Sequence, residues 1–346
     1  MDQLVVVTGA SGFVGSHLVV ALLKGGYRVR LLARGERAKL LERTVVQRHN
    51  RAELFTITDI ATDDLGPAFQ GASAIFHVAT PLAGRADVRT ALESAVRGTL
   101  NVLEYSAKQN ITKVVLTGST ASCRTPGVND IWTGKVYTEE DWGHVTEEQV
   151  LDGSRDAMWI YSATKILAER AAWDFAERHH EVDITSLNFP FIYGPFADGF
   201  PTPQPSALGA NRLLYQLIVG EKDRPLPLQL PPSFCDVRDV ATAHIRALQI
   251  PLAKDVQSKR ILVSGGYFLW KDAVDYLQEV RPQLSERLPS TKNAPTPPGS
   301  PSIISNSRAE AVLGFSSYID WKRTLVETID DLLRAEKLWA SGTAKA

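Results

Sequence analysis

Residues Leu4–Leu18, LVVVTGASGFVGSHL, are the stretch that decides the fold. An apolar run leads into three glycines with the spacing Gly-x-x-Gly-x-x-Gly, and a helical pattern follows. A buried strand, a tight turn and a helix start in this order form a site for a dinucleotide pyrophosphate. We expect Gly9 to turn the chain, Gly12 to let a phosphate approach the backbone, and Gly15 to let the helix pack closely. A plain turn without a ligand is the alternative.

The first turn of this helix offers further phosphate contacts. The first N–H groups of a helix have no partner within the helix, and the helix dipole favours an anion beside them. We therefore predict that Ser11, Phe13 and Val14 bind the cofactor together with the three glycines.

Composition excludes several classes of partner. The chain has 346 residues, of which 44% are apolar, and its 38 basic and 39 acidic residues give a net charge of −1. This balance gives no electrostatic case for a nucleic acid or a membrane surface. Cys123 and Cys235 are the only cysteines, so we predict neither a disulfide framework nor a metal site. No apolar run is long enough for a membrane span. We expect a soluble, cytoplasmic protein, monomeric or homodimeric.

The first half of the chain alternates strands and helices. This alternation predicts an α/β protein with a Rossmann-type, doubly wound parallel sheet and a smaller, discontinuous C-terminal substrate domain. Residues 1–190 and about 234–265 would form the dinucleotide-binding domain, and about 191–233 with 266–346 the substrate domain. The strands are expected at Tyr27–Ala33, Leu54–Ile60, Ala74–Pro81, Lys113–Ser122, Ile184–Phe189 and Ile261–Ser264, and the helices at Val14–Lys24, Ala91–Gln109 and Trp321–Trp339.

The end of the second strand bears on the cofactor. An NAD site usually carries a carboxylate there for the ribose 2′-hydroxyl, whereas an NADP site carries a cation for the 2′-phosphate. Here Ala33 is followed by Arg34, whose guanidinium matches phosphate oxygens. We predict NADP(H), with Arg37 or Lys39 assisting Arg34. A solvated charge cluster is the alternative, and Glu36 would serve NAD if it faced the ribose.

Hydroxyl side chains end the strand that begins at Lys113. Ligands bind at the carboxyl ends of strands in open α/β sheets, so Ser119, Thr120 and Ser122 are candidates for contact with a substrate. A hydroxyl at this place can donate a hydrogen bond to an oxygen that gains negative charge.

A Tyr-x-x-x-Lys motif is a candidate proton donor. Residues four apart share one face of a helix, so Lys165 can lie beside Tyr161 and lower the pKa of its phenol. The lysine has further donors for ribose hydroxyls. The chain contains the motif three times: Tyr161/Lys165, Tyr267/Lys271 and Tyr318/Lys322. Only Tyr161/Lys165 follows the hydroxyl-bearing strand and also lies at the start of a long helical pattern.

Together these motifs resemble the extended short-chain dehydrogenase/reductases over nearly the whole chain, and in particular their dihydroflavonol-reductase-like group. The stretches 77–81, 167–173, 190–195 and 234–241 carry this likeness beside the glycine turn and Tyr-x-x-x-Lys. The resemblance implies that Ser119, Tyr161 and Lys165 are catalytic, although Gly118 departs from the family's Thr-Ser-Ser pattern. It also implies cofactor contacts from Asp59, Ile60, Ala79, Thr80, Pro190 and Ile192.

The resemblance implies an NADPH-dependent reductase that converts a small aldehyde, ketone or dihydroflavonol-like carbonyl compound to an alcohol. Hydride would pass from the nicotinamide, and Tyr161 would give the proton. The alternatives are an NAD-dependent nucleotide-sugar epimerase or dehydratase on the same fold and a non-catalytic dinucleotide-sensing protein. We expect His77, which alternates within a strand, to be a core histidine and Asn101 to serve helix packing. The acidic run Glu139–Asp141 is expected to be solvated.

Overall fold

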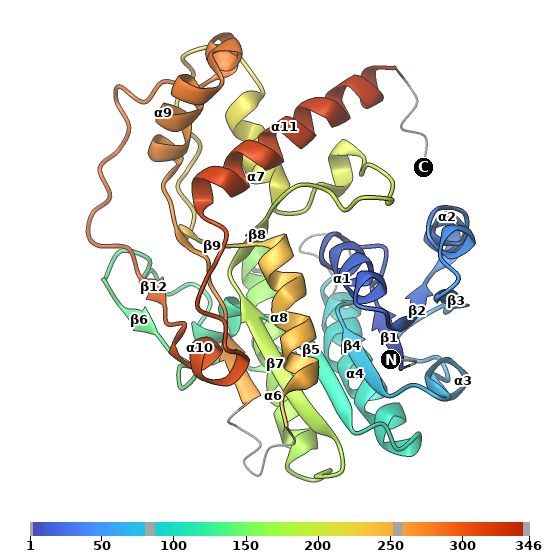
Figure 1. Ribbon diagram of the computed structural model, residues 1–346. Helices are drawn as coiled ribbons and strands as arrows, with labels where there is room; N and C mark the ends of the chain where they lie inside the picture. Colours follow the sequence, from blue (N-terminus) through green and yellow to red (C-terminus); the bar gives the residue numbers. More distant parts are fainter. Residues whose placement is uncertain (1–2, 80–86, 252–258, 342–346) are drawn as a thin grey trace.

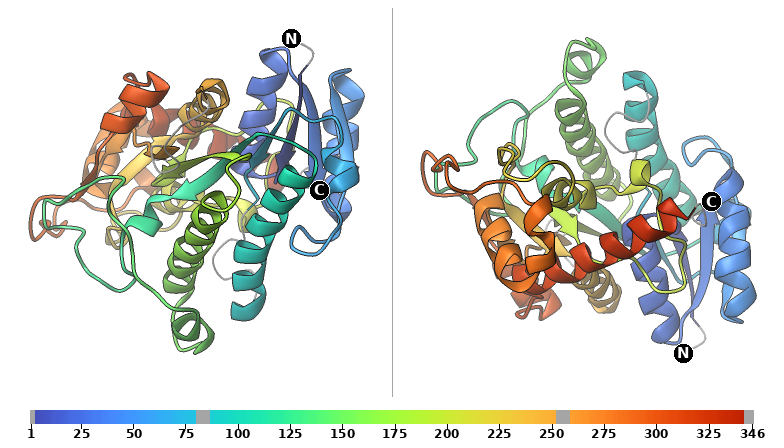
Figure 2. Two further views of the ribbon diagram at one scale, coloured as in Figure 1. Left: turned by 90° about the horizontal axis from the view of Figure 1, so that it is seen from below. Right: turned by 90° about the horizontal axis from the view of Figure 1, so that it is seen from above.

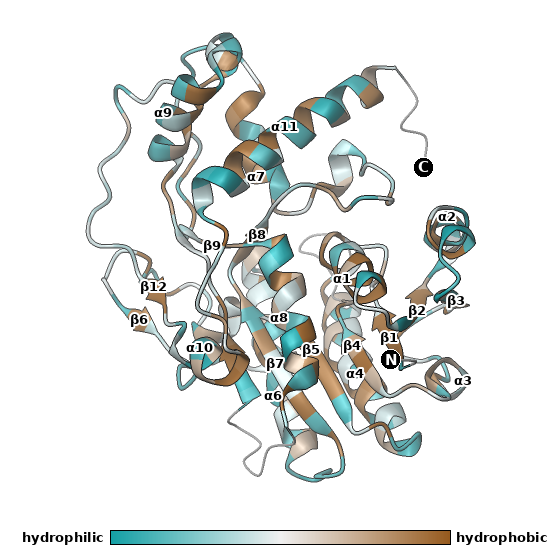
Figure 3. Ribbon diagram, viewed as in Figure 1, coloured by the Kyte–Doolittle hydropathy of each residue, from teal (hydrophilic) through white to brown (hydrophobic). Residues whose placement is uncertain are grey.

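Apolar residues on both faces of the strands place the central sheet between two layers of helices. In the first strand, Val5 and Val7 belong to one hydrophobic core and Val6 to another, on the opposite face. The structure is a computed structural model that describes residues 3–79, 87–251 and 259–341. Figure 3 shows these strands as largely hydrophobic ribbons in the middle of the molecule.

The sheet has seven parallel strands in the order β10-β7-β5-β4-β1-β2-β3. The direction of winding reverses between β1 and β4, so a crevice for a ligand is expected beyond their carboxyl ends. The predicted Rossmann-type fold is therefore confirmed. The strands are β1 (Leu4–Thr8), β2 (Arg28–Ala33), β3 (Ala52–Thr56), β4 (Ala74–His77), β5 (Lys113–Ser119), β7 (Asp183–Phe189) and β10 (Arg260–Leu262).

Helices cover both faces of this sheet (Figures 1 and 2). The first core lies under α1 (Phe13–Lys24), α2 (Gly35–Thr44), α8 (Val237–Gln249) and α10 (Ser307–Leu313). The second core lies under α3 (Gly66–Phe69), α4 (Val88–Lys108) and α6 (Ala157–Ala176). The short helix α5 (Glu147–Leu151) packs on α4 and α6. Within the described ranges, no helix combines the length and the hydrophobicity that a bilayer crossing needs.

A third hydrophobic core lies beyond the carboxyl end of the sheet, where α7, α9 and α11 gather at the top of Figure 1. It packs under a small sheet with the order β11-β9-β8. A further pair, β6 (Val136–Tyr137) and β12 (Ile303–Ile304), joins distant parts of the chain. The elements of this part are β8 (Phe191–Tyr193), β9 (Ser233–Asp236), β11 (Gly266–Tyr267), α7 (Asn211–Ile218), α9 (Trp270–Val280) and α11 (Trp321–Ala340).

The proposed domain boundaries stay a prediction, and the cores follow most of them. Elements β10 and α8 return to the large sheet after the excursion through α7, as the discontinuous assignment requires. Helix α10 differs from the expectation, because Ala309 and Leu313 pack in the core of the large sheet rather than under α11.

The third strand is shorter than predicted. Pairing with β2 ends where Ala33 meets Thr56, four residues before the expected end at Ile60. The Asp59 carboxylate then accepts a hydrogen bond from the Ala61 N–H at 2.9 Å, which turns the chain away from the sheet. Asp59 and Ile60 therefore lie in the loop that follows β3.

Candidate active site

The glycine turn brings the carboxyl ends of β1 and β4 into close contact. Gly9 has φ +67°, and a Cβ there would lie 2.8 Å from the Ala79 nitrogen. A Cβ on Gly15 would lie 2.2 Å from the Gly9 carbonyl oxygen, so helix α1 rests directly on the turn. The Gly12 N–H donates to the same oxygen at 2.9 Å. A side chain at position 9 or 15 would push this turn apart.

The start of α1 has no side-chain cap. Gly12 is the N-cap of α1 and brings no side chain to the first turn. In α6, by contrast, the Asp156 carboxylate accepts from two first-turn N–H groups. The turn around Ser11, Phe13 and Val14 therefore fits a diphosphate that would serve as the missing acceptor. These contacts themselves stay a prediction.

His77 ties β1, β4 and α4 together beneath this turn. The Thr8 hydroxyl oxygen accepts from the Ala79 N–H at 3.1 Å and lies 2.9 Å from His77 Nδ1. On the other side of the ring, Nε2 lies 3.4 Å from the Thr99 hydroxyl. Burial lowers the pKa of His77 to about 3, so the ring is neutral. The prediction of a core histidine is confirmed. Thr80, which follows Ala79, lies outside the described residues.

The predicted adenine loop is held by helix α4. The Asn101 amide donates to the carbonyl oxygens of Ile60 and Asp63, both at 3.0 Å. A Cβ on Gly98 would lie 3.0 Å from an Ile60 methyl carbon, so the glycine lets this loop approach the helix. The Asn101 amide thus fixes the loop that carries Asp59 and Ile60, a role beyond the helix packing we expected.

Arg34 is exposed at the carboxyl end of β2, as the N-cap residue of α2. No carboxylate pairs with it within the ranges that the structure describes. The nearby Glu36 carboxylate instead accepts from the Lys39 ammonium at 2.7 Å, and both of these side chains are exposed. Glu36 therefore pairs with Lys39, and the exposed Arg34 has no such carboxylate partner among the described residues. Its contact with a 2′-phosphate stays a prediction.

Lys165 joins helix α6 to the end of β5. Its ammonium donates to the Thr117 carbonyl oxygen at 2.9 Å, and its side chain is buried. Burial lowers the pKa of Lys165 to about 8, while the carboxylate of Glu169 acts to raise it. Tyr161 lies one helical turn earlier on the same face and is half-buried.

Ser119 lies at the end of β5 and reaches the Tyr161 phenol. Its hydroxyl oxygen accepts from the Ala121 N–H at 3.2 Å, which orients the side chain. Burial raises the pKa of Tyr161, and the hydrogen bond with Ser119 offsets part of that rise. Our expectation that Lys165 lowers this pKa is therefore wrong for the structure. Burial outweighs the other effects, and the lysine directs a hydrogen bond at Thr117.

The two alternative hydroxyls face away from Tyr161. Ser122 is fully buried, donates to the Ser119 carbonyl oxygen at 2.8 Å and accepts from Arg260 at 3.1 Å. The Thr120 hydroxyl lies 3.5 Å from a backbone carbonyl oxygen of β7. Among the three candidates, geometry therefore brings Ser119 to the tyrosine.

The other two Tyr-x-x-x-Lys pairs lie outside the large sheet and α6 and make other contacts. Tyr267 is exposed in β11, and Lys271 pairs with Asp275 at 2.6 Å. The Tyr318 hydroxyl donates to the Phe315 carbonyl oxygen at 3.2 Å. Neither tyrosine belongs to the large sheet or to α6.

The predicted nicotinamide loop begins beside Ser119. Phe189 pairs with Ser119 in the sheet, so Pro190 follows directly at the same edge, and Ile192 lies one strand further in β8. The Asn211 side chain holds the loop by donating to the Gly194 carbonyl oxygen at 2.8 Å and accepting from its N–H at 3.3 Å. Contacts of Pro190 and Ile192 with a cofactor stay a prediction.

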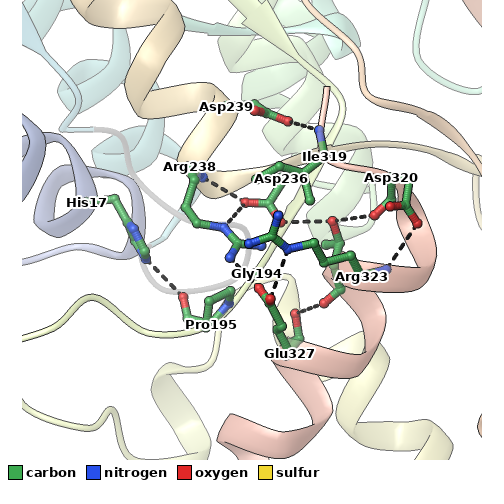
Figure 4. Close-up of polar contacts among 12 residues, drawn as sticks. His17, Gly194, Pro195, Asp236, Arg238, Asp239, Ile319, Asp320, Arg323 and Glu327 are labelled. Carbon is green, nitrogen blue, oxygen red and sulfur yellow. Dashed lines mark hydrogen bonds and ion pairs between the residues drawn. The ribbon is translucent and has the colours of Figure 1, made fainter. Parts of the chain in front are cut away.

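A polar cluster connects the cofactor helix to the C-terminal half (Figure 4). His17 of α1 lies 2.9 Å from the Pro195 carbonyl oxygen, and burial lowers the pKa of its ring. The Asp236 carboxylate binds Arg238 at 2.7 Å, and Arg238 also pairs with Glu327 of α11. We did not anticipate this cluster from the sequence, because its members are far apart along the chain.

The fold and this side-chain arrangement define the short-chain dehydrogenase/reductase class of dinucleotide-dependent proteins. Within the described residues, no group of three or more His, Cys, Asp or Glu side chains is placed to hold a metal ion. The model of the NAD dependent epimerase/dehydratase family matches residues 5–261, and the chain belongs to this family. The predicted membership of the extended short-chain dehydrogenase/reductases is thereby confirmed.

Individual relatives cover nearly the whole chain. The ketoreductase azaE of Aspergillus niger is 31% identical over 90% of this chain and 92% of its own length. The yeast methylglyoxal/isovaleraldehyde reductase Gre2, crystallised with NADPH, superposes with a TM-score of 0.81 at 26% identity, over 97% of this chain and 99% of the other. Gre2 of Candida albicans in its NADPH complex gives 0.83 at 26% identity, over 96% and 99%.

Proposed function

We propose that this protein is an NADPH-dependent reductase that converts a small aldehyde or ketone to an alcohol. It is an NADP(H)-dependent oxidoreductase, as the sequence predicts and as its NADPH-bound relatives show. The observation that carries the proposal is the placement of Ser119, Tyr161 and Lys165 together where β5 ends beside α6. The predicted cytoplasmic location and the monomeric or homodimeric state stay predictions.

The three side chains have different roles in the proposed reduction. When bound, NADPH supplies the hydride that the carbonyl carbon accepts. Tyr161 donates its phenolic proton to the oxygen of the substrate. Ser119, oriented by the Ala121 N–H, donates a hydrogen bond to the same oxygen as negative charge develops. Lys165 binds the ribose hydroxyls of the cofactor.

The remaining predicted residues would hold the rest of the cofactor. The uncapped start of α1 offers its N–H groups to the diphosphate. Arg34 offers a guanidinium to the 2′-phosphate, and the absence of a carboxylate at the end of β2 favours NADP(H) over NAD(H) there. The loop with Asp59 and Ile60, fixed by α4, is available to the adenine.

A substrate panel tests the proposed reaction. We expect NADPH absorbance to fall with methylglyoxal, isovaleraldehyde and simple ketones, and to stay constant when the Tyr161→Phe variant replaces the wild type. The same panel includes a nucleotide sugar with NAD⁺. Conversion of that sugar without reduction of any carbonyl compound would instead support the epimerase or dehydratase alternative. Tight NADPH binding without turnover of any compound would support a dinucleotide-sensing protein.

A further inference from the structure

Glu169 lies on the same face of α6 as the proposed proton donor and its lysine. It follows Lys165 by four residues and Tyr161 by eight, so the three side chains form one stripe along the helix. Glu169 is 6% exposed. Removing a carboxylate from water costs free energy, so its burial must be offset by other interactions or retained for a function. The steps proposed above give it no role.

Three donors hold one oxygen of this carboxylate and leave the other unpaired. Glu169 Oε1 accepts from the Ser186 hydroxyl at 2.8 Å, the Asn188 amide at 2.7 Å and the Arg260 guanidinium at 3.1 Å. Oε2 has no hydrogen-bond partner among the residues that the structure describes. The carboxylate is thus fixed in place while part of its charge is left uncompensated by hydrogen bonds.

Gly118 is what allows Asn188 to reach Glu169. A Cβ at position 118 would lie 1.7 Å from the Asn188 Oδ1 atom, so any side chain there would displace the amide. The departure of Gly118 from the family's Thr-Ser-Ser pattern therefore has a structural consequence. It makes room for a donor that anchors Glu169 directly behind the end of β5.

Arg260 ties the same carboxylate to the Ser119 turn. Its guanidinium stacks on Trp142 at 3.8 Å and donates to the Asp141 carbonyl oxygen at 3.0 Å and the Ser122 hydroxyl at 3.1 Å. Ser122 in turn donates to the Ser119 carbonyl oxygen. Arg260 is therefore anchored independently of Glu169.

Several groups of the described residues bear on the charge of the Lys165 ammonium. On its own helix, Glu169 acts to raise the pKa of Lys165, and the half-buried Tyr161 phenol is neutral near pH 7. His77 of β4, which is neutral, lies near the ammonium, and the Thr117 carbonyl oxygen of β5 accepts a hydrogen bond from it. Burial acts to lower the pKa of this lysine. Within the described residues, Glu169 is the carboxylate that opposes this effect.

We propose that Glu169 is a positioning residue that keeps Lys165 protonated at neutral pH, so that the lysine can bind the cofactor's ribose. The inference rests on the role proposed for Lys165, but it does not depend on which carbonyl compound is reduced. It extends the functional stripe on α6 from Tyr-x-x-x-Lys to Tyr-x-x-x-Lys-x-x-x-Glu.

The test measures NADPH affinity by cofactor fluorescence between pH 6.5 and 10. Affinity of the wild type should weaken as Lys165 loses its proton, and Lys165→Met should abolish this dependence. In Glu169→Gln the midpoint should move down by about one pH unit, because a nearby opposite charge raises the pKa of an ammonium and its loss lowers it. Glu169→Asp should restore most of the wild-type midpoint.

Asp183→Asn is the matched control. It removes a carboxylate from another ion pair, with the Lys259 ammonium at 2.6 Å, at the opposite end of β7. This variant should lose stability and keep the wild-type midpoint. If Glu169→Gln does not fold, Glu169→Gln with Arg260→Met removes both charges of the pair and should still shift the midpoint down, but by less, because the loss of the Arg260 cation acts in the opposite direction.

An unchanged midpoint in folded Glu169→Gln, or an equal shift in Asp183→Asn, would overturn the inference. Because the readout is binding, it is independent of turnover. A midpoint shift without reduction of any carbonyl compound would uphold Glu169 and reject the proposed reaction instead.

Discussion

The two ends of the proposed cofactor site differ in how their charged groups are held. At the nicotinamide end, Lys165 is buried, hydrogen-bonded to Thr117 and backed by Glu169. At the 2′-phosphate end, Arg34 is exposed, and Lys39 pairs with an equally exposed Glu36. Charges interact strongly in a buried environment, whereas water and salt screen them at the surface. We therefore expect the chemistry at the buried end and an effect on cofactor affinity at the exposed end.

The largest effect is expected from Tyr161→Phe. Loss of the proton donor should lower kcat by about 10³-fold, within the range for general acid catalysis, while NADPH affinity stays near that of the wild type. Steady-state turnover and cofactor fluorescence measure the two quantities separately. Tyr267→Phe changes the exposed tyrosine of another Tyr-x-x-x-Lys pair and should leave both unchanged. Turnover near the wild-type rate in Tyr161→Phe would show that Tyr161 is not the proton donor.

Ser119→Ala should lower kcat by about 10²-fold, as expected for a lost donor to a developing oxyanion. The control is Ser122→Ala, which removes a hydroxyl that donates to the Ser119 backbone and accepts from Arg260. That variant should melt at a lower temperature and keep kcat within a few-fold of the wild type. If the two variants exchange these effects, Ser119 has been assigned wrongly.

Arg34→Ala should affect the choice of cofactor rather than the rate of reaction. A charge-assisted phosphate contact contributes about 1.5–3 kcal/mol, which corresponds to roughly ten- to a hundredfold in affinity. The ratio of kcat/KM with NADPH to that with NADH should fall by such a factor, and the loss should shrink at high salt. Arg37→Ala should change this ratio less. A wild type that prefers NADH would place Glu36 at the ribose.

The smallest effect on activity is expected where a buried charge lies away from both ends. Asp239 of α8 is 7% exposed and accepts from the Ile319 N–H at 2.8 Å (Figure 4). Burial raises its pKa to about 6. Because this value exceeds that of the unfolded chain, the carboxyl stabilises the fold below about pH 4, and this contribution is lost as pH rises through 6.

Asp239→Asn should therefore be more stable than the wild type at pH 8, by about 2 kcal/mol, and nearly equal to it at pH 4. Thermal unfolding at the two pH values measures the difference, and the cofactor ratio should not change. A variant that is less stable at pH 8 would show that the carboxylate gains more from Arg238 and Arg323 than it loses through burial.

Local sequence was enough to predict the motifs of the site. The glycine turn, the strand that precedes it and the pair Tyr161/Lys165 each lie within a few residues, and the geometry of a turn or a helix then places their atoms. For the same reason, the α/β alternation predicted the sheet and its winding. Boundaries were less accurate where a side chain turns the backbone, as Asp59 does after β3.

Tertiary structure decided several questions that depend on burial or on distant partners. The acidic run was predicted to be solvated, yet Glu139 is 6% exposed and accepts from the Leu262 N–H at 3.1 Å. The resemblance already favoured Ser119 over Ser122, and the structure adds that the Ser122 hydroxyl accepts from Arg260, a distant residue of the chain. The direction of the pKa shift of Tyr161 depends on burial that no helical spacing encodes.

The physical reason for this division is the range of the interactions. Backbone geometry, capping and i,i+4 contacts act between neighbours in sequence, so a single stretch of sequence determines them. Desolvation and ion pairing depend on which segments meet in space, and β5, β7 and β10 meet only after the sheet has formed. The sequence by itself therefore determined the fold and the Tyr-x-x-x-Lys pair, whereas the folded chain decided the surroundings that Glu169 and Arg260 provide for it.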